Sequence, residues 1–429
     1  MEKRSKRFHI ITYGCQMNQY DSGIISEILK KEGYIPVNNE READVVILNT
    51  CAVREHAEKR VIGRIHSLGR LKKRKNIKIG VVGCMAKRLP ELLEIPEVDF
   101  VAGPDAYRNL PVIIGRAGVF EEGNPFEDYN EIWPLNKDIS AYVSISRGCD
   151  NFCSYCIVPY VRGPLRSRPV YTILEEVEYL VGQGVKEIIL LGQNVNEYNY
   201  KGVGFASLLG MVADIKGVEM LNFLTSHPKD IDYNMFRVMA EKKNMVRYLH
   251  LPVQAGNNRI LKLMNRHYTV EEYRDTVERL RSILPDVTLT TDLLVGFPGE
   301  TEKEFMDTLA LVEEIRFDHA FMFRYSPRPG TLAALMEDKL TDEEKIKRLR
   351  KLIGVQNRII RERNKEMVGK SFRCIVMKPA KKGGYLCKTW TGKYIAVSEN
   401  VNIGDVISVK VTHLRGNTPV GIIQKDKEE

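Results

Sequence analysis

The most informative absence in this chain of 429 residues is a long hydrophobic run. No apolar stretch approaches the roughly 20 residues that a membrane-spanning helix needs. The basic residues 1–7 are not followed by an apolar segment either, so nothing resembles a secretory signal. We therefore expect a cytoplasmic protein without a membrane partner, in a compartment where thiols stay reduced and available to metals.

Cys149, Cys153 and Cys156 form a CxxxCxxC triplet. The chain has no second CxxC motif of the kind that completes the two-part ligand set of a zinc ribbon. A closed tetrahedral zinc site would therefore need a distant fourth ligand. Three thiolates this close can hold one metal centre and leave a coordination position vacant for a substrate or cofactor. The spacing and its context favour an iron–sulfur cluster, with zinc as the alternative and a disulfide disfavoured.

Length and charge set broad limits on the class of protein. A chain of 429 residues suggests two or three domains, and 43% hydrophobic with 28% charged residues is typical of a globular protein. The net charge of +9 favours a polyanionic partner such as RNA. A generic lysine-rich surface would give the same net charge, so charge alone leaves both readings open.

The first region, residues 7–125, alternates short apolar runs with helical patterns. Continuous apolar strands separated by helices favour a parallel sheet that is covered on both faces. Asp21 and Ser22 offer an N-cap to a helix over 23–31, and a long basic helix is expected over 55–73. The expected strands are 8–12, 45–48, 79–82 and 99–101.

Cys15, Cys51 and Cys84 each follow the carboxyl end of one of these strands. Ligand sites in open α/β sheets form in the crevice outside those ends. We therefore expect the three cysteines to meet at one edge of the sheet and to form a second three-thiolate metal site. The alternative is three separate buried cysteines, which are common singly.

The second region, residues 135–365, repeats a strand–helix unit six times. Six such units predict an open, partial (β/α)6 barrel, in which polar residues after each strand form the active site. Helices are expected between the strands, for example over 270–283 and 302–315. The expected strands are 141–146, 187–191, 220–225, 246–251, 288–295 and 320–324.

The third region, residues 367–427, reads as five short strands with polar turns and predicts a small antiparallel β-barrel of the oligonucleotide-binding kind. Cys374 and Cys387 lie in these strands and are expected to be small buried residues. A basic helix precedes the barrel, and it is either a solvated face or a surface for phosphate contacts. Its cations are Lys345, Lys347, Arg348, Arg350, Lys351, Arg358, Arg361, Arg363 and Lys365.

Several motifs together resemble the radical S-adenosylmethionine methylthiotransferase family. The CxxxCxxC triplet carries Tyr155 before its last cysteine, as that superfamily's signature does. The resemblance covers nearly the whole chain, and the closing barrel resembles the RNA-binding TRAM domain. The other matching stretches are TYGCQMN (12–18), NTCAVR (49–54), GCMA (83–86), GFPGET (296–301) and YSPRPGT (325–331).

This resemblance implies an iron–sulfur transferase that processes tRNA. It implies one 4Fe–4S cluster on Cys149, Cys153 and Cys156, which binds S-adenosyl-L-methionine, and an auxiliary 4Fe–4S cluster on the other triplet. Residues at or near strand ends are further candidates for contacts with S-adenosylmethionine. The candidate cofactor-binding residues are Tyr155, Gln193, Ser226, Gln254, Asp292 and Glu300.

Within the family, CQMN at 15–18 and CIVPYVRG at 156–163 look most like the MiaB type. That type adds a methylthio group to carbon 2 of N(6)-isopentenyladenosine next to the anticodon, using two S-adenosylmethionine molecules. Alternative targets are threonylcarbamoyl-adenosine in tRNA or a ribosomal-protein aspartate. One departure is Leu165, where the family usually has a carboxylate.

The resemblance also implies partners. The substrate is the anticodon stem-loop of tRNA, the electron donor is a protein such as flavodoxin or ferredoxin, and a separate sulfide source is required. We expect a monomer. His227 and His250 read as strand-end or core histidines rather than proton shuttles. An alternative of a different class is a non-catalytic RNA-binding metalloprotein.

Overall fold

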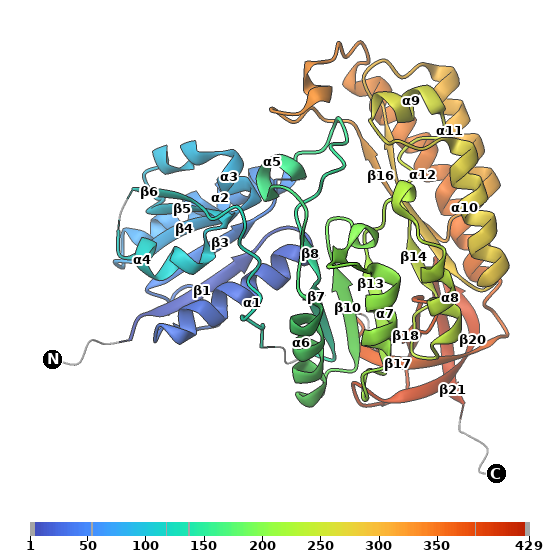
Figure 1. Ribbon diagram of the computed structural model, residues 1–429, viewed down its shortest axis with the longest axis horizontal. Helices are drawn as coiled ribbons and strands as arrows, with labels where there is room; N and C mark the ends of the chain where they lie inside the picture. Colours follow the sequence, from blue (N-terminus) through green and yellow to red (C-terminus); the bar gives the residue numbers. More distant parts are fainter. Residues whose placement is uncertain (1–4, 53–54, 117, 136–137, 382, 425–429) are drawn as a thin grey trace.

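The computed structural model describes residues 5–52, 55–116, 118–135, 138–381 and 383–424. The strands form three assemblies that follow one another along the chain (Figure 1). They are a parallel sheet, an open barrel of parallel strands and a small closed barrel, which confirms the α/β fold class expected from the sequence.

The first assembly is a six-stranded parallel sheet in the order β2-β1-β3-β4-β5-β6. All six residues of β3 are buried, as expected for a strand whose two faces are both covered by helices. The strands are β1 Arg7–Thr12, β2 Ile35–Pro36, β3 Val45–Thr50, β4 Lys78–Gly83, β5 Phe100–Asp105 and β6 Val119–Gly123. Strands β2 and β6 were not predicted. Strand β2 is only two residues long and both are exposed, and β6 alternates only between half-buried and exposed residues.

The start of α1 corrects the sequence prediction. Helix α1 spans Gln16–Lys31 with Cys15 as its N-cap, so it begins about two turns before the expected cap at Asp21 and Ser22. Asp21 instead lies buried in the interior of the helix, where it forms ion pairs with Arg147 and Arg162. The other helices of the first assembly are α2 Glu55–Lys72, α3 Cys84–Arg88 and α4 Leu110–Ile114.

The second assembly contains the six parallel strands that the sequence predicts. Two three-stranded sheets, β7-β10-β13 and β14-β15-β16, are joined by a parallel bridge between Leu221 and Met245. The strands therefore follow one another in chain order, as in an open (β/α) barrel. They are β7 Ser140–Ser144, β10 Glu187–Leu191, β13 Met220–Leu224, β14 Tyr248–His250, β15 Thr288–Val295 and β16 His319–Arg324.

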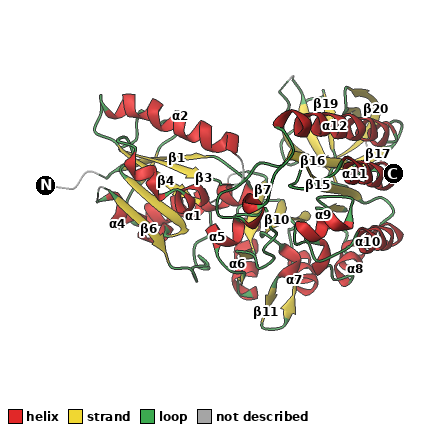
Figure 2. Ribbon diagram, turned by 90° about the horizontal axis from the view of Figure 1, so that it is seen from above, coloured by secondary structure: helices red, strands yellow, loops and turns green. Residues whose placement is uncertain are grey.

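Helices pack around this barrel (Figure 2). Three of them, α10, α11 and α12, begin with a Thr–Glu capping box, and the expected starts of α10 and α11 are confirmed. None of the helices in the described residues is both long and apolar enough to cross a lipid bilayer. The helices are α5 Val158–Arg162, α6 Val170–Gly182, α7 Phe205–Ala213, α8 Asn234–Glu241, α9 Asn258–Leu263, α10 Val270–Ile283, α11 Glu302–Ile315 and α12 Asp342–Lys365.

Short elements complete the connections. The paired strands are β8 Ser146–Arg147 with β9 Arg166–Ser167, and β11 Asn199–Tyr200 with β12 Val203–Gly204. The 3-10 helices are η1 Pro90–Glu94, η2 Tyr107–Asn109, η3 Val195–Glu197, η4 Pro228–Asp230 and η5 Leu332–Leu335.

The third assembly is a closed five-stranded barrel in the order β17-β18-β19-β21-β20. Its pairings are antiparallel except that between β19 and β21, which is parallel. Cys374 and Cys387 are buried in its core, as expected. The strands are β17 Ser371–Pro379, β18 Tyr385–Thr389, β19 Tyr394–Val397, β20 Val406–Arg415 and β21 Thr418–Gln424.

The closed barrel docks against the amino ends of the parallel strands. Lys388 forms a buried ion pair with Glu187, the first residue of β10. Lys393 pairs with Asp318, which directly precedes β16, at 2.6 Å. The closed barrel thus contacts the end of the strands opposite to their carboxyl ends.

Much of the basic charge on α12 is used inside the molecule. Lys345 pairs with Asp338, Arg348 with Glu300, and Arg363 with Asp318. These three cations are therefore paired with carboxylates and belong neither to a freely solvated face nor to a phosphate-binding surface. The helix keeps exposed cations at Lys347, Arg350, Lys351, Arg361 and Lys365.

The Lys388–Glu187 pair leads to a prediction for stability. Replacing Lys388 by Met leaves a buried carboxylate without its cation, and we expect a loss of about 3–5 kcal/mol. The double replacement Glu187→Leu with Lys388→Met should be less destabilised, because no unpaired charge remains. Thermal unfolding midpoints measure both effects. Lys410→Met, at an exposed lysine of the same barrel, is the control; an equally large loss there would contradict the prediction.

Candidate metal centres and active site

Strand register brings the first group of cysteines to one edge of the parallel sheet. Thr50 of β3 is paired with Gly83 of β4, so Cys51 and Cys84 follow directly on neighbouring strands. Cys15 follows β1, the other neighbour of β3. Cys15 is exposed, whereas Cys51 and Cys84 are buried.

Two glycines permit the close approach of these cysteine loops. Gly14 has φ +140°, and a Cβ there would lie 2.5 Å from the Cβ of Cys51. Gly83 has φ +97°, and a Cβ there would lie 2.5 Å from the carbonyl oxygen of Thr50. Any side chain at either position would push the cysteine-bearing backbones apart.

Buried amides hold this edge together. The Oδ1 of Asn18 accepts hydrogen bonds from the backbone N–H and the thiol of Cys15, both at 3.3 Å. The Nδ2 of Asn18 donates to Asn49 Oδ1 and to Thr50 O, each at 3.1 Å. Asn18 and Asn49 were not predicted as site residues, although both lie within the motifs quoted for the resemblance.

Arg162 connects the cysteine-bearing edge of the parallel sheet to the second assembly, the open barrel. Its Nε donates to the Sγ of Cys84 at 3.2 Å, from helix α5 immediately after the second cysteine triplet. A hydrogen bond with Cys51, together with the positive charge of Arg162, lowers the pKa of Cys15 to about 6. Helix α5 contacts α3, whose first residue is Cys84, and Figure 1 shows α5 beside α3.

Asp21 anchors Arg162. Its carboxylate accepts from Arg147 Nη2 at 2.9 Å and from Arg162 Nη2 at 2.8 Å. Burial alone would raise the pKa of Asp21, but the two arginines outweigh it and hold the pKa below its ordinary value. A buried carboxylate on α1 thus fixes two arginines of the second body.

The buried charges near the first triplet do not balance. Among the described residues, the ion pairs of Arg147, Arg162 and Arg166 are with two carboxylates, Asp21 and Asp105. The Nη1 atoms of Arg147 and Arg162 are buried and have no hydrogen-bond partner among the described residues. Burying an uncompensated cation is costly, so this environment fits an anionic group such as a thiolate-ligated iron–sulfur cluster.

The second triplet lies in the loop that follows β8. Arg266 Nη1 donates to the Sγ of Cys153 at 3.2 Å, and Asn151 Nδ2 donates to the Sγ of Cys149 at 3.5 Å. Phe152 has φ +45°, an uncommon conformation for a bulky residue. Asn265 Nδ2 holds it by donating to Phe152 O at 2.9 Å.

The thiols of this triplet are crowded and partly or fully buried. Burial raises the pKa of Cys149, and burial together with the charge of Cys153 raises the pKa of Cys156 to about 12. Metal cations reverse this effect, because a coordinating thiol loses its proton. The donor set therefore fits a metal centre that binds with release of protons.

No three thiol, imidazole or carboxylate side chains in the described part of the chain are placed so that they could hold a single metal ion. A 4Fe–4S cluster takes its thiolates on different irons, so its cysteines surround the cluster rather than converge on one point. In the described residues, neither triplet is placed as the ligand set of a single zinc ion.

Three predicted S-adenosylmethionine contacts lie at the carboxyl side of the barrel. Gln193, after β10, accepts from the N–H of Gly148, next to Cys149, at 2.7 Å. Tyr155 is packed against the barrel core, and burial raises its pKa well above the ordinary value. Ser226, after β13, has a buried Oγ without a partner among the described residues.

The other three predicted contacts are held by the protein itself. Gln254 has φ +70°, and its N–H donates to Asp292 O at 2.9 Å. Asp292 lies within β15, 3.5 Å from His250 Nε2. Glu300 accepts from the N–H of Gly296 at 2.7 Å and from Arg348 at 2.6 Å.

Buried polar atoms without partners gather after consecutive parallel strands. They belong to residues that follow β7, β10 and β13, where such barrels bind their ligands. Each of these atoms would destabilise the fold unless a ligand or a water molecule formed a hydrogen bond with it. Ser226 was predicted as a cofactor contact and His227 was read as a strand-end or core histidine, whereas Ser146 and Asn194 were not predicted as contacts. A polar residue directly after an apolar strand is the signal that could have found them. The atoms are Ser146 Oγ, Asn194 Oδ1, Ser226 Oγ and His227 Nε2.

His227 is held neutral at this edge. Burial, with a further contribution from Arg266, lowers its pKa to about 2. Its Nδ1 accepts from the N–H of Lys229 at 3.3 Å, so the ring proton resides on Nε2. The orphaned Nε2–H is thus a donor that is available to a ligand.

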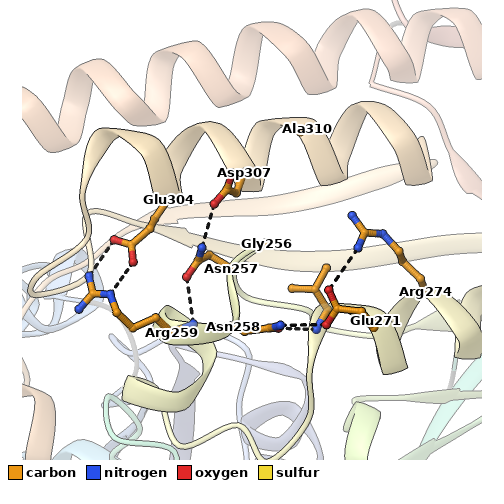
Figure 3. Close-up of a pocket in the computed structure, with 10 residues that line it drawn as sticks. Gly256, Asn257, Asn258, Arg259, Glu271, Arg274, Glu304, Asp307 and Ala310 are labelled. Carbon is orange, nitrogen blue, oxygen red and sulfur yellow. Dashed lines mark hydrogen bonds and ion pairs between the residues drawn. The ribbon is translucent and has the colours of Figure 1, made fainter.

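A cleft of about 420 Å³ between α9, α10 and α11 lies elsewhere. Its polar groups bind one another: Arg259 pairs with Glu304, and Asn257 donates to Asp307 (Figure 3). None of the cysteines or predicted cofactor contacts lines it. The cleft is therefore not the candidate active site.

Two family models match the chain. One, described as "Uncharacterized protein family UPF0004", matches residues 7–103, and the other, the radical SAM superfamily, matches residues 143–312. The first match ends within the parallel sheet, and the second covers β10, β13, β14 and β15 in full and the end of β7.

Curated relatives match nearly the full length. A tRNA-2-methylthio-N(6)-dimethylallyladenosine synthase of Clostridium novyi is 44% identical, over 95% of this chain and 94% of the relative. The chain belongs to the family of these synthases. Enzymes of the same name from Pelotomaculum thermopropionicum and Parabacteroides distasonis are 42% and 41% identical, over 97% and 95% of this chain and 98% and 93% of the relatives.

Solved structures support the fold. The radical S-adenosylmethionine methyltransferase TsrM from Kitasatospora setae gives a TM-score of 0.57 over 77% of both chains, at 14% identity. The cobalamin-dependent radical enzyme OxsB gives 0.55 over 80% of this chain and 56% of its own. The chain is thus a radical S-adenosylmethionine enzyme, and its family implies 4Fe–4S clusters and S-adenosylmethionine.

The neutral state of His227 predicts a pH dependence of stability. Because folding lowers its pKa from about 6.5 to about 2, its contribution is complete above pH 6.5 and is lost as the pH falls towards 2. Relative to His227→Gln, we expect the cofactor-free wild type to lose about 1.4 kcal/mol of unfolding free energy per pH unit below about pH 6. Denaturation at pH 5, 6 and 7.5 measures this gap; parallel pH profiles would contradict it.

Proposed function

We propose that this enzyme adds a methylthio group to carbon 2 of N(6)-isopentenyladenosine next to the anticodon of tRNA. The observation that carries the proposal is the pair of cysteine triplets, connected through Arg162 and Asp21. The names of the full-length relatives support the choice of substrate.

Each triplet has its own task in this proposal. Cys149, Cys153 and Cys156 would hold the 4Fe–4S cluster that binds S-adenosylmethionine, and Cys15, Cys51 and Cys84 would hold the auxiliary cluster. When bound, these cofactors supply the radical and sulfur chemistry that carbon 2 of adenine requires and that side-chain acids and bases cannot provide. One S-adenosylmethionine would provide the radical and another the methyl group.

The protein's own residues bind and orient. Asn18 and its glycine-lined surroundings fix the loop of Cys15, while Arg266 and Asn151 hold the thiols of Cys153 and Cys149. Burial of Cys51 and Cys84 excludes water on one side, and the exposure of Cys15 leaves the opposite side accessible. This arrangement suits a site that an RNA substrate must approach from solvent.

The contacts to S-adenosylmethionine remain part of the proposal. Gln193 and Ser226 are best supported, because one lies against the second triplet and the other carries a buried oxygen without a partner. Tyr155, Gln254 and Asp292 stay candidates through their places in the barrel. Glu300 would act through the loop 296–300, whose N–H groups and Arg348 it binds.

The proposal includes three domains: 7–125 for the auxiliary cluster, 135–365 for radical chemistry and 367–427 as an RNA-binding TRAM domain. The exposed cations of α12 and the closed barrel give tRNA a basic surface. At the departure from the family pattern, the N–H of Leu165 donates to Asp150 Oδ1 at 3.0 Å, so the loop is tied without a carboxylate at this position. A cytoplasmic monomer, a flavodoxin or ferredoxin as electron donor and a sulfide source complete the proposal.

Single cysteine replacements separate the two tasks. Cys153→Ala should abolish both reductive cleavage of S-adenosylmethionine and methylthio transfer, whereas Cys51→Ala should keep cleavage and lose transfer. Each variant should hold about four irons per chain instead of about eight. Cys374→Ala, at a buried cysteine outside both triplets, is the control and should keep both reactions. Methylthio transfer by Cys51→Ala would overturn the role given to the first triplet.

The substrate is tested by mass spectrometry of tRNA nucleosides. A deletion strain should lose 2-methylthio-N(6)-isopentenyladenosine and accumulate the unmodified isopentenyladenosine. A plasmid copy should restore the product, and the Cys153→Ala copy should not. An unchanged level in the deletion strain, with loss of methylthio-threonylcarbamoyl-adenosine or of a modified ribosomal aspartate, would refute the proposed substrate. Purified protein with zinc and without iron would instead favour a non-catalytic RNA-binding protein.

A further inference from the structure

Each cysteine triplet has a buried arginine in contact with one of its thiols. Arg162 Nε lies 3.2 Å from the Sγ of Cys84, and Arg266 Nη1 lies 3.2 Å from the Sγ of Cys153. The two arginines are only 3% and 4% exposed. The two sites therefore share one feature, a buried arginine that donates to a cysteine sulfur, although the triplets lie in different assemblies of the molecule.

The two arginines differ in what surrounds them. Arg162 is paired with Asp21, a carboxylate that it shares with Arg147. Arg266 donates instead to neutral oxygens, Pro252 O at 2.8 Å and Tyr268 Oη at 2.9 Å. The positive charge of Arg162 is thus partly balanced by a neighbouring carboxylate, whereas Arg266 has only neutral oxygen acceptors among these contacts.

We propose that Arg162 and Arg266 are positioning residues that each set the reduction potential of the cluster on their own triplet. Hydrogen bonds to cysteine sulfur and a nearby buried positive charge both favour the more negative, reduced form of an iron–sulfur cluster. Each arginine would therefore raise the potential of its own cluster. This inference depends on the proposed function, because it requires a cluster on each triplet.

Asp21 stays in place and paired with Arg147 when Arg162 is replaced. Each replacement therefore removes one positive charge and one hydrogen bond to a cysteine sulfur. We expect shifts of similar size at the two triplets.

The test uses full-length chains that retain one triplet each. The first background carries alanine at Cys149, Cys153 and Cys156. The second background carries alanine at Cys15, Cys51 and Cys84. Arg162→Gln and Arg266→Gln are introduced into both backgrounds, and the remaining cluster is titrated with dithionite under electron paramagnetic resonance.

The reduction potential of the remaining cluster should change when the replaced arginine contacts the retained triplet (a matched pair). It should not change when the arginine contacts the removed triplet (a crossed pair). Arg162→Gln in the first background, and Arg266→Gln in the second, should lower the ratio of reduced to oxidised cluster at a fixed potential about tenfold, or about 59 mV for one electron. The crossed combinations should change it less than about twofold. Arg162→Lys and Arg266→Lys keep the charge and should recover part of the shift.

Arg147→Gln is the control for Arg162, because Arg147 shares Asp21 but makes no hydrogen bond to a cysteine among the described residues. Its shift should be smaller than that of Arg162→Gln. Unchanged potentials in the matched pairs, or equal shifts in the crossed pairs, would overturn the inference. Loss of iron from both the Gln and the Lys variants would also overturn it, in favour of a purely structural role. Absence of iron from the parent backgrounds would instead refute the proposed clusters.

Discussion

The arrangement of the two cysteine triplets depends on the buried carboxylate of Asp21. It is fully enclosed, and it binds Arg147 and Arg162 of the second body at 2.9 and 2.8 Å. Losing one partner of a buried ion pair typically costs about 3–5 kcal/mol, so the pairing strongly restrains the relative position of α1 and α5. Because Arg162 also binds Cys84, this restraint fixes the first triplet against the loop of the second.

A second buried network supports the same interface. Glu176 of α6 accepts from Tyr20 of α1 at 3.1 Å and from Arg168 at 2.6 Å. Tyr20 and Asp21 are adjacent, so one helix carries both connections between the sheet and the barrel (Figure 1). Buried polar networks of this kind tolerate little misplacement, because each unsatisfied group costs free energy.

Sequence patterns predicted most of the fold for definite reasons. Strands β10 and β15 and helices α10 and α11 have the expected bounds, because apolar runs and Thr–Glu capping boxes are local signals. The start of α1 was missed because a cysteine cap is unusual and the polar pair at Asp21 resembled a cap. The pairing of Lys345 and Arg348 on α12 was missed because their carboxylate partners lie in other elements.

The sequence by itself determined the chemistry of the thiols and the number of strand–helix units. CxxxCxxC is a local pattern, and the position of a cysteine after an apolar strand can be read without coordinates. Only the tertiary structure decided which residues of the second assembly contact the first triplet. Arg162 and Cys84 are 78 residues apart, and Arg162 and Asp21 are 141 apart. Such contacts are set by strand register and by the docking of two bodies, and neither is encoded in a local run of residues.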